Sequence, residues 1–310
     1  MTFEEVTVDH RPDKMRALLF LNPRSRNGSG RAANDAVRQL EVGGITLTPS
    51  LCHKPEEMRH EIARRAQEVD CVIVGGGDGT VNAALSSLVN TGLPLGILPL
   101  GTTNDLARTL CIPIDPVAAA TIITAGYKRR IDVGQVNDQF FLNVASMGLS
   151  VELARRMTGN LKRHLGRLSY PLAAVKTAIY MRPFAAEVVT TDSTIQLRSL
   201  QIAVGNGVYY GGGMAVYEAA AIDDQCLDFY SVAPRQFWQW PLFLAAFRRG
   251  RNRNLGGMRA FCSSGPLEVH TDPPLPVNTD GEITTFTPAR FTLLPLALAV
   301  FAPAARARHQ

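Results

Sequence analysis

Glycines, an acid and a hydroxyl residue follow one another in GGGDGT, directly after the apolar run CVIV. Glycines let backbone amides approach phosphate oxygens closely, and a helix that starts just after such a turn attracts anions. This composition therefore predicts binding of nucleotide phosphates. The residues concerned are Gly75, Gly76, Gly77, Asp78, Gly79 and Thr80.

The carboxylate of Asp78 needs its own explanation. Among amides that face a phosphate it would repel the ligand unless a cation lay between them, so we expect Asp78 to bind Mg²⁺ directly or through water. A plainer interpretation stays open at this stage. Glycines also make tight turns between a strand and a helix, and Thr80 is a good helix cap.

Two further loops repeat this composition. PLGTTNDLART follows the next apolar run, and LNPRSRNGSGR follows the first one. Asn104 also fits the N-cap of a helix over LARTL. Three such loops at one sheet edge would form a cleft of nucleotide size, and no GxxxxGK[ST] motif is present, which excludes a P-loop enzyme. The candidates are Asn22, Gly101, Thr102, Thr103 and Asn104 for the nucleotide, and Asp105 for the metal.

A third group of polar residues lies near the end of the chain, in NTDGE, with Asp280 and Glu282. Phosphoryl transfer to an alcohol needs a carboxylate that accepts the hydroxyl proton. Asp-Gly is also the commonest hairpin signal, and from these residues alone a surface turn is the favoured interpretation. Asp132 and Asn143 fit ordinary hairpin positions equally well.

The elements that must position these loops change in character along the chain. Residues 15–125 alternate short apolar runs with helical patterns near 29–41, 55–68, 80–90 and 115–125, which predicts parallel strands with helical crossovers. Period-2 runs then follow, which predicts a mainly antiparallel β-sandwich, interrupted by a helical stretch from residue 149. We expect an α/β domain over residues 1–126 and a β-sandwich domain over 127–310, whose last strand packs back on the first domain.

Composition limits the remaining possibilities. The chain has 310 residues, 46% of them hydrophobic, and a net charge of +5. This balance suits a phosphate-rich partner or an anionic membrane surface. The apolar stretches fall short of a membrane span. Five cysteines without a CxxC pair argue against a disulfide framework and a zinc site, and with no secretory signal they favour the cytoplasm.

These motifs together resemble the diacylglycerol kinase-like lipid kinase family, in its bacterial branch. NPRSRNGSG is similar to the family's NPxSG, GGGDGTVNAAL to GGDGTxNE, PLGTTNDLAR to PLGTxNDFAR, and NTDGE to its DGE motif. The resemblance implies an ATP- and Mg²⁺-dependent lipid kinase. ATP would be bound by the glycine loops between an α/β domain and a β-sandwich that covers the lipid. It also implies that Asp280 is the general base, with Glu282 beside it.

The resemblance implies a second, structural metal site, bound by Asp224 with the carbonyl oxygens of Ala221 and Cys226. Gln225 stands where the family has glycine, so we expect an altered turn and a less secure site there. Ala83 and Leu106 also depart from the family pattern, away from the phosphate chemistry.

The lipid side is less clear from the sequence. Leucines at helical spacing would either line an acyl pocket or pack as core, and basic clusters would be either solvated or attracted to anionic headgroups at the inner face of the membrane. The leucines are Leu161, Leu165, Leu168 and Leu172. The basic residues are Arg155, Arg156, Lys162, Arg163, Arg167, Arg248, Arg249, Arg251 and Arg253.

Several alternatives stay open. An NAD kinase-like enzyme shares the GGDGT loop, and a non-catalytic regulator could keep the fold and bind nucleotide or membrane. Nucleic acid is not expected as a partner, because the arginine clusters lack interleaved aromatic residues. The lipid alcohol that accepts the phosphate and the choice between monomer and homodimer are left open.

Overall fold

The computed structural model describes residues 15–23, 25, 30–52, 54–156, 181–207, 209–210, 214–215, 221–233 and 257–303. The first half alternates strands and helices along the chain, as the apolar pattern predicts. Its elements are β1 (Arg16–Leu21), α1 (Arg31–Val42), β2 (Thr46–Ser50), α2 (Pro55–Arg65), β3 (Cys71–Gly76), α3 (Asp78–Thr91), β4 (Leu95–Pro99), α4 (Asp105–Thr109) and α5 (Pro116–Ala125).

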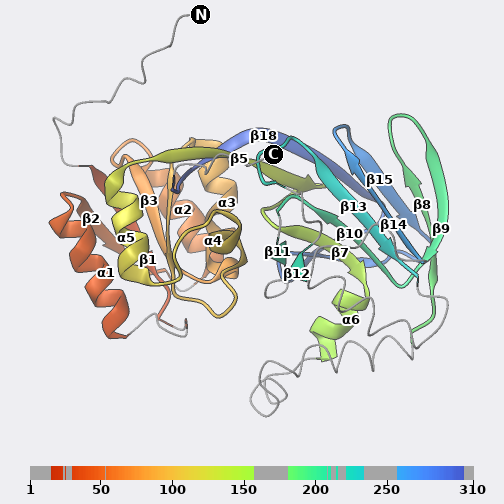
Figure 1. Cartoon of the computed structure of the whole chain (residues 1–310), viewed down its shortest axis with the longest axis horizontal. Coiled ribbons are helices and arrows are strands. Elements are labelled where there is room, and N and C mark those ends of the chain that lie inside the picture. The colour runs from red at the N-terminus through yellow and green to blue at the C-terminus, as the bar shows by residue number, and fades with distance from the viewer. Residues whose placement is uncertain are drawn as a thin grey trace, which may run out of the picture.

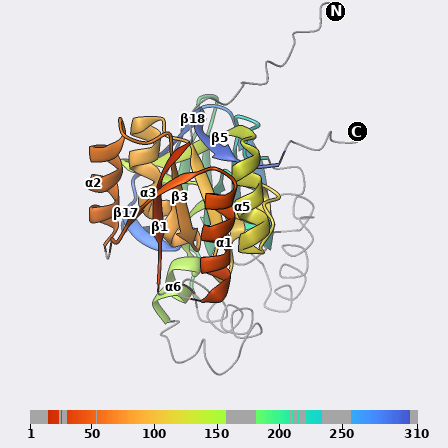
Figure 2. The ribbon, with the colours of Figure 1, turned by 90° about the vertical axis from the view of Figure 1, so that its left-hand side faces the viewer.

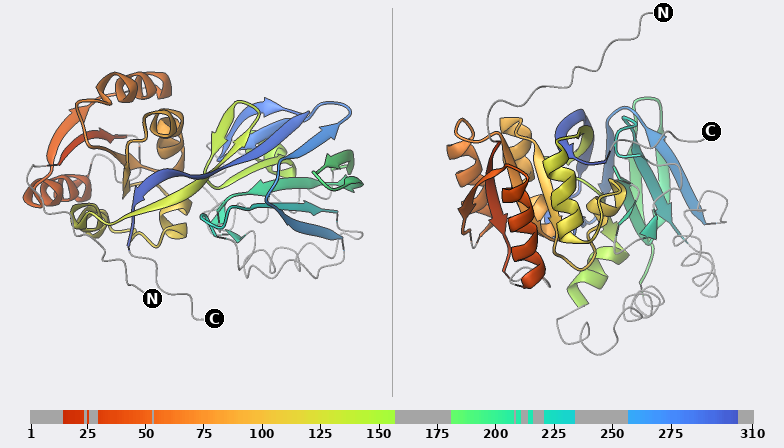
Figure 3. Two further views of the ribbon diagram at one scale, coloured as in Figure 1. Left: turned by 90° about the horizontal axis from the view of Figure 1, so that it is seen from above. Right: turned by 60° about the vertical axis from the view of Figure 1, so that its left-hand side comes forward.

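A parallel sheet in the order β2-β1-β3-β4 forms the centre of this half. Helices α1 and α5 pack together on one face, and α2 and α3 pack together on the other (Figures 2 and 3). Every residue of β3 and β4 is buried, because helices cover both faces of the sheet. The carboxyl ends of β3 and β4 therefore open side by side at one edge.

The second half is built from antiparallel strands. They are β5 (Lys128–Val136), β6 (Gln139–Phe141), β7 (Val144–Gly148), β8 (Phe184–Val189), β9 (Thr194–Ser199), β10 (Gln201–Gly205), β11 (Tyr209–Tyr210), β12 (Met214–Ala215), β13 (Leu227–Val232), β14 (Met258–Ser263), β15 (Leu267–Thr271), β16 (Pro276–Thr279), β17 (Glu282–Phe286) and β18 (Ala289–Phe301), with α6 (Leu149–Arg156) after β7.

Two layers of these strands enclose one apolar core. One layer has the order β14-β13-β10-β7-β16-β17, and the other contains β18, β15, β8 and β9. Met147 and Phe229 of the first layer pack in the same buried cluster as Val188 and Phe291 of the second. This is a β-sandwich, so the expected fold class is confirmed.

Strands β5 and β18 run through both halves, as Figure 1 shows along one edge of the molecule. Residues 128–131 of β5 pair with 298–301 of β18 beside the parallel sheet, where Val300 also pairs with Leu95 of β4. Residues 133–136 pair with 291–294 inside the sandwich, and the register breaks between Leu294 and Leu298. The expectation that the tail forms a last strand is confirmed, and this strand joins the two sheets.

The cysteine prediction is wrong in one respect. Cys226 and Cys262 form a disulfide between the start of β13 and β14. The pair was hidden in the sequence because its members are 36 residues apart and meet only when these two strands align. In the described part of the chain no helix is both long and apolar enough to cross a bilayer.

Candidate active site

The two glycine loops touch each other at the carboxyl edge of the parallel sheet. The amides of Leu100 and Gly101 donate to the carbonyl oxygen of Gly76, at 3.0 and 3.2 Å. A side chain on Gly101 would lie 2.4 Å from the Cα atom of Gly77. Glycine is therefore required at this crossing by close backbone packing. Gly77 and Gly101 are both partly exposed.

Asn22 and Thr80 connect the loop after β1 to the glycine loop after β3. The Asn22 amide nitrogen of the main chain donates to the carbonyl oxygen of Gly75 at 2.9 Å, and its Nδ2 donates to Thr80 Oγ1 at 3.0 Å. Gly75 and Gly76 are buried, and a side chain on Gly76 would collide with Thr80. Gly75 and Gly76 therefore allow neighbouring side chains to pack closely against the loop. The loop becomes accessible to solvent only from Gly77 onward.

Asp78 lies between the loops and is the first residue of α3. Its Oδ2 accepts a hydrogen bond from Thr103 Oγ1 at 2.7 Å, and its Oδ1 accepts one from the amide of Leu106 at 3.1 Å. Leu106 is the second residue of α4, so Asp78 satisfies an otherwise free amide at the start of that helix. One carboxylate thus holds the β4–α4 loop in place.

Of the two expected helix caps, the position of Asn104 is confirmed and that of Thr80 is wrong. Helix α3 starts at Asp78 with Gly77 at its N-cap, so Thr80 lies inside the first turn. Asn104 does occupy the N-cap position of α4, but its backbone is left-handed (φ 51°) and its side chain caps nothing. Its Oδ1 and Nδ2 pair instead with the amide and carbonyl of Gly101, at 3.1 and 3.2 Å. Thr102 and Thr103 between them remain exposed.

Asp280 and Gly281 form the two-residue turn between β16 and β17, and both have positive φ. The hairpin interpretation is therefore confirmed, and it does not exclude a role for the acid. Asp280 Oδ2 accepts from the amide of Leu142 at 2.7 Å, and Oδ1 accepts from the amides of Asn143 and Val144, both at 3.0 Å. Three consecutive amides thus hold the carboxylate.

Burial of this carboxyl group raises the pKa of Asp280 to about 6, against the opposing effect of the three amides. The negative charge of Asp78 adds a smaller effect, which raises the pKa of Asp280 further. The two carboxylates come from different halves of the molecule. A carboxyl group with a pKa near neutrality is suited to accept and release a proton at physiological pH.

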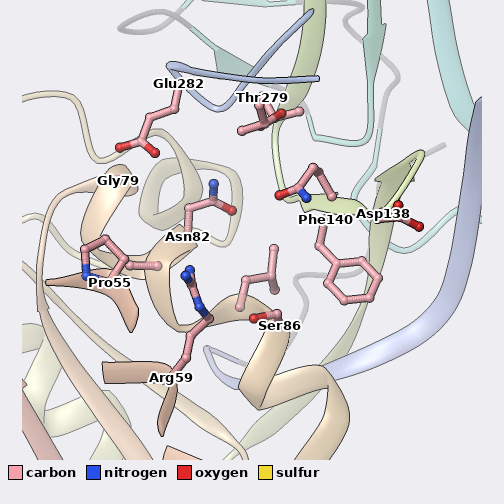
Figure 4. A pocket seen from close by; sticks show the side chains of 13 residues that line it. Pro55, Arg59, Gly79, Asn82, Ser86, Asp138, Phe140, Thr279 and Glu282 are labelled. Carbon is pink, nitrogen blue, oxygen red and sulfur yellow. The ribbon is translucent and has the colours of Figure 1, made fainter. Parts of the chain in front are cut away.

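A cavity of about 110 Å³ lies between the halves, beside the first turns of α3. Gly79 and Asn82 line it from α3, and Glu282 lines it from β17. Figure 4 shows the Glu282 side chain extending from the hairpin toward Gly79. A side chain on Gly79 would meet no protein atom within 4 Å, so this glycine borders open space. Asp280 does not line this cavity, although Glu282 does.

The expected metal ligands are not gathered into one acidic cluster. No group of three or more Asp, Glu, His or Cys side chains that could hold a metal occurs within the described residues. Asp105 is buried as the first residue of α4, next to the loop that Asp78 holds. The oxygens of Asp78 and the exposed loop hydroxyls are the hard ligands that Mg²⁺ prefers, and Mg²⁺ commonly takes only one or two carboxylates besides phosphate and water.

The predicted second metal site forms a compact turn. Asp224 accepts hydrogen bonds from the amides of Ala221 and Cys226, at 3.0 and 3.1 Å. Burial raises the pKa of Asp224, and the charges of Asp132 and Asp223 raise it further. Gln225 has a left-handed backbone (φ 57°), so the chain keeps a conformation that glycine favours even though it carries a side chain there.

The sequence underestimated Asp132 and the loop at Asn143. Asp132 is fully buried at the junction of the halves, where it accepts from the amides of Gln225 and Leu296, both at 2.7 Å. Asn143 belongs to the amide loop that binds Asp280. The predicted acyl-pocket leucines, the two arginine clusters and Gly28 and Ser29 of the first loop lie outside the residues or side chains that the structure describes.

Two family models match the chain, one for each half. Residues 16–136 match the diacylglycerol kinase catalytic domain, and residues 143–302 match the YegS C-terminal NAD kinase beta sandwich-like domain. The chain belongs to the diacylglycerol kinase-like lipid kinase family. The resemblance inferred from the short motifs is therefore confirmed over nearly the whole sequence.

Relatives in this lipid kinase family match over most of their length. A "Probable lipid kinase YegS-like" of Chromohalobacter salexigens is 33% identical over 78% of this chain and 79% of its own. A "Diacylglycerol kinase" of Mycobacterium tuberculosis is 30% identical over 95% of this chain and 96% of its own. The crystal structure of a diacylglycerol kinase from Bacillus anthracis str. Sterne shares the fold, with a TM-score of 0.78 at 23% identity over 94% of this chain and 98% of its own.

Proposed function

We propose that this lipid kinase transfers the γ-phosphoryl group of ATP to the hydroxyl of a lipid such as diacylglycerol. The observation that carries the proposal is the shared cavity, which Gly79 of the glycine loop lines from one half and Glu282, two residues after Asp280, lines from the other. Asp78 belongs to a phosphate-type glycine loop, and Asp280 has a pKa raised to about 6. In-line phosphoryl transfer needs such an arrangement, with charge neutralisation on one side and a proton acceptor on the other.

The phosphates of ATP would lie against the exposed part of the glycine loops. Gly77, Gly79, Thr102 and Thr103 are the positions where amides or hydroxyls reach the surface. The cavity beside Gly79 leads from these loops to Asn82 and Glu282, and it is suited to take the nucleoside end. Support for this placement comes from the open space next to Gly79 and the burial of Gly75 and Gly76.

Magnesium, when bound, would neutralise the phosphate charge, and Asp78 is the residue best placed to hold it, with Asp105 behind it. Thr103 and the Leu106 amide orient the Asp78 carboxylate and leave it further lone pairs. Asp224 with the carbonyl oxygens of Ala221 and Cys226 stays a proposal for a structural site. The surrounding charges of Asp132 and Asp223 favour a cation there.

Asp280 is our candidate for the general base. The hydrogen bonds that it accepts from three main-chain amides occupy most of its lone pairs and fix its orientation. One direction is left for a substrate hydroxyl. Glu282 faces the cavity and is a second candidate for contact with the ligand. The acceptor lipid would enter from a membrane surface, with the protein bound peripherally on the cytoplasmic side.

Two variants separate these roles. Asp280→Asn removes the proton acceptor and is expected to lower kcat by roughly 10²- to 10⁴-fold while ATP still binds. Glu282→Gln, matched in size and charge change, is expected to raise the KM for ATP more than it lowers kcat. The assay is phosphorylation of a lipid extract, with the product identified by mass spectrometry. Wild-type turnover in Asp280→Asn would refute the base assignment.

The same assay tests the other two functions. An NAD kinase-like enzyme would phosphorylate NAD in a mixture that also contains diacylglycerol. A non-catalytic regulator would bind ATP and vesicles without transferring phosphate to any lipid. The matches of both halves to lipid kinase relatives favour the lipid acceptor.

A further inference from the structure

Asn206, directly after β10, lies at the centre of a hydrogen-bond network behind the Asp280 turn. Only 2% of its surface is exposed. Its Nδ2 donates to two carbonyl oxygens, that of Asp132 at 2.9 Å and that of Leu142 at 3.0 Å. Its main-chain amide donates to the carbonyl oxygen of Asn143 at 2.9 Å. One residue therefore connects strand β5 to the loop that carries the Asp280-binding amides.

That loop has two sides with different partners. The amides of Leu142, Asn143 and Val144 point to Asp280. On the other side, the carbonyl oxygen of Leu142 accepts from Asn206 Nδ2, and that of Asn143 accepts from the main-chain amides of Asn206 and Gly207. A peptide plane is rigid, so fixing its carbonyl oxygen also fixes the direction of the N–H on that plane. The Leu142 carbonyl shares its plane with the Asn143 amide, and the Asn143 carbonyl shares its plane with the Val144 amide.

We propose that Asn206 is a positioning residue for Asp280: its side chain orients the peptide plane whose Asn143 amide binds Asp280 Oδ1. The next plane, that of the Val144 amide, is held by the main-chain amides of Asn206 and Gly207. This inference rests on the proposed function only for its kinetic consequence. The geometry itself links Asn206 to the carboxylate through two peptide units. Asp132 anchors the far end, because its side chain is clamped between Gln225 and Leu296.

The side-chain oxygen of Asn206 supports a role beyond filling space. This buried Oδ1 has no hydrogen-bond donor among the described residues, and the same holds for Oδ1 of Asn143. A buried acceptor without a partner is unfavourable for folding. The side chain keeps this orientation because its nitrogen alone satisfies two carbonyl oxygens at once.

The test uses Asn206→Ala with Gln201→Ala as matched control. Gln201 lies at the other end of β10 and is also a buried amide that forms several hydrogen bonds, but to Ser150 and Ile202 rather than to residues 142–144. Asn206→Ala removes the side-chain bond to the Leu142 carbonyl and keeps the main-chain bonds to the Asn143 carbonyl. Hydrogen bonds from amides to a carboxylate lower its pKa, so a misaligned Asn143 amide in this variant would raise the pKa of Asp280.

Charged groups on the surrounding elements do not change in either variant. They are Asp78 on α3, whose charge acts on Asp280, the cavity-lining groups Glu282 on β17, Asp138 in the β5–β6 turn and Arg59 on α2, and Glu152 on α6, which packs against β16. A shift in the titration of Asp280 would therefore report the amides. We expect the acid limb of kcat/KM to move up by about half to one pH unit in Asn206→Ala and to stay in place in Gln201→Ala.

A second readout does not depend on activity. The pKa of Asp280 is measured from the ¹³C shift of its carboxyl group in aspartate-labelled protein, assigned by the signal lost in Asp280→Asn. If the wild type phosphorylated no lipid while this pKa still rose in Asn206→Ala, the proposed function would fail and the positioning role would stand. An unshifted pKa in a folded Asn206→Ala variant would overturn the positioning role.

Asn206→Ser guards against a folding defect, because it keeps one donor in a smaller side chain and should give a smaller shift in the same direction. If neither variant folded, Asn206 would be a stability residue only, and the proposal would be overturned. An equal shift in Gln201→Ala would have the same consequence, since the effect would then come from general loosening of the sandwich.

Discussion

Asp280 is both a residue of the β16–β17 turn and an acid with a raised pKa. Its positive φ suits the two-residue hairpin turn, and three amides and a buried setting determine its pKa. Residue types alone could not decide between the hairpin and the base. The structure shows that the hairpin brings this carboxylate to the amides of residues 142–144, so the turn is compatible with the proposed base.

The pH dependence of turnover follows from the raised pKa of Asp280. The base must be ionised to accept a proton, so activity is present above pH 6 and is lost as the pH falls through about 6. An unperturbed aspartate would lose activity only near pH 4. Steady-state kcat/KM from pH 4.5 to 8.5 checks this, with circular dichroism at each pH to exclude unfolding. An acid limb near pH 4 would contradict it.

Gly79 and Gly101, one in each loop, should contribute differently to stability and to ATP binding. Gly79→Ala adds a methyl group into open space on α3, so it should leave stability unchanged or raise it by up to about 1 kcal/mol while weakening ATP binding roughly tenfold. Calorimetric titration with ATP and a thermal melt without ligand measure the two effects. Wild-type ATP affinity in this variant would exclude a nucleotide beside Gly79.

Gly101→Ala is the contrasting variant. Its methyl group would collide with the backbone of Gly77, so both stability and ATP binding should fall. If Gly101→Ala were as stable as the wild type, the close crossing of the two loops would be wrong.

At the scale of elements, the sequence predicted the types of the helices and strands better than the residues at which they begin and end. The helix expected near residues 80–90 begins at Asp78, because Gly77 takes the N-cap and Asp78 is used as an acceptor for the next helix. A local pattern contains no information on such a partner, which comes from another loop. For the same reason the sequence did not reveal the roles of Asn206 and Asp132. Their side chains form hydrogen bonds with residues 64 to 164 positions away in the sequence.

Asp132 should stabilise the junction between β5, β18 and the Asp224 turn. Asp132→Ala leaves the amides of Gln225 and Leu296 without their acceptor, which should cost roughly 2–4 kcal/mol of unfolding free energy. Asp192→Ala, in the exposed β8–β9 turn, is the control and should change stability by less than about 0.5 kcal/mol. Urea denaturation measures both, and equal costs would show that the junction depends on other contacts.

For the whole molecule, the strand β18 pairs with strands of both halves. The order of elements and the two architectures could be predicted from apolar periodicity, and the family motifs added the site. The pairing of β18 with both β4 and β5 could not be predicted, because a 13-residue apolar run contains no information on which strands lie beside it.

We therefore expect a single unfolding transition. Helices α1 to α5 dominate the far-ultraviolet signal of the first half, whereas both tryptophans, Trp238 and Trp240, belong to the second half of the chain. Circular dichroism at 222 nm and tryptophan fluorescence should give coincident urea curves. Curves with separate midpoints would show that the halves unfold independently despite the shared strand.

The place of β18 in the chain also bears on synthesis at the ribosome. Strands β1 to β4 emerge long before residues 289–301, and the turn that carries Asp280 precedes β18 by only a few residues. A nascent chain thus has its phosphate-type loops well before it has the acid that would take the proton. The proposed site can therefore assemble only after nearly the whole chain has been synthesised.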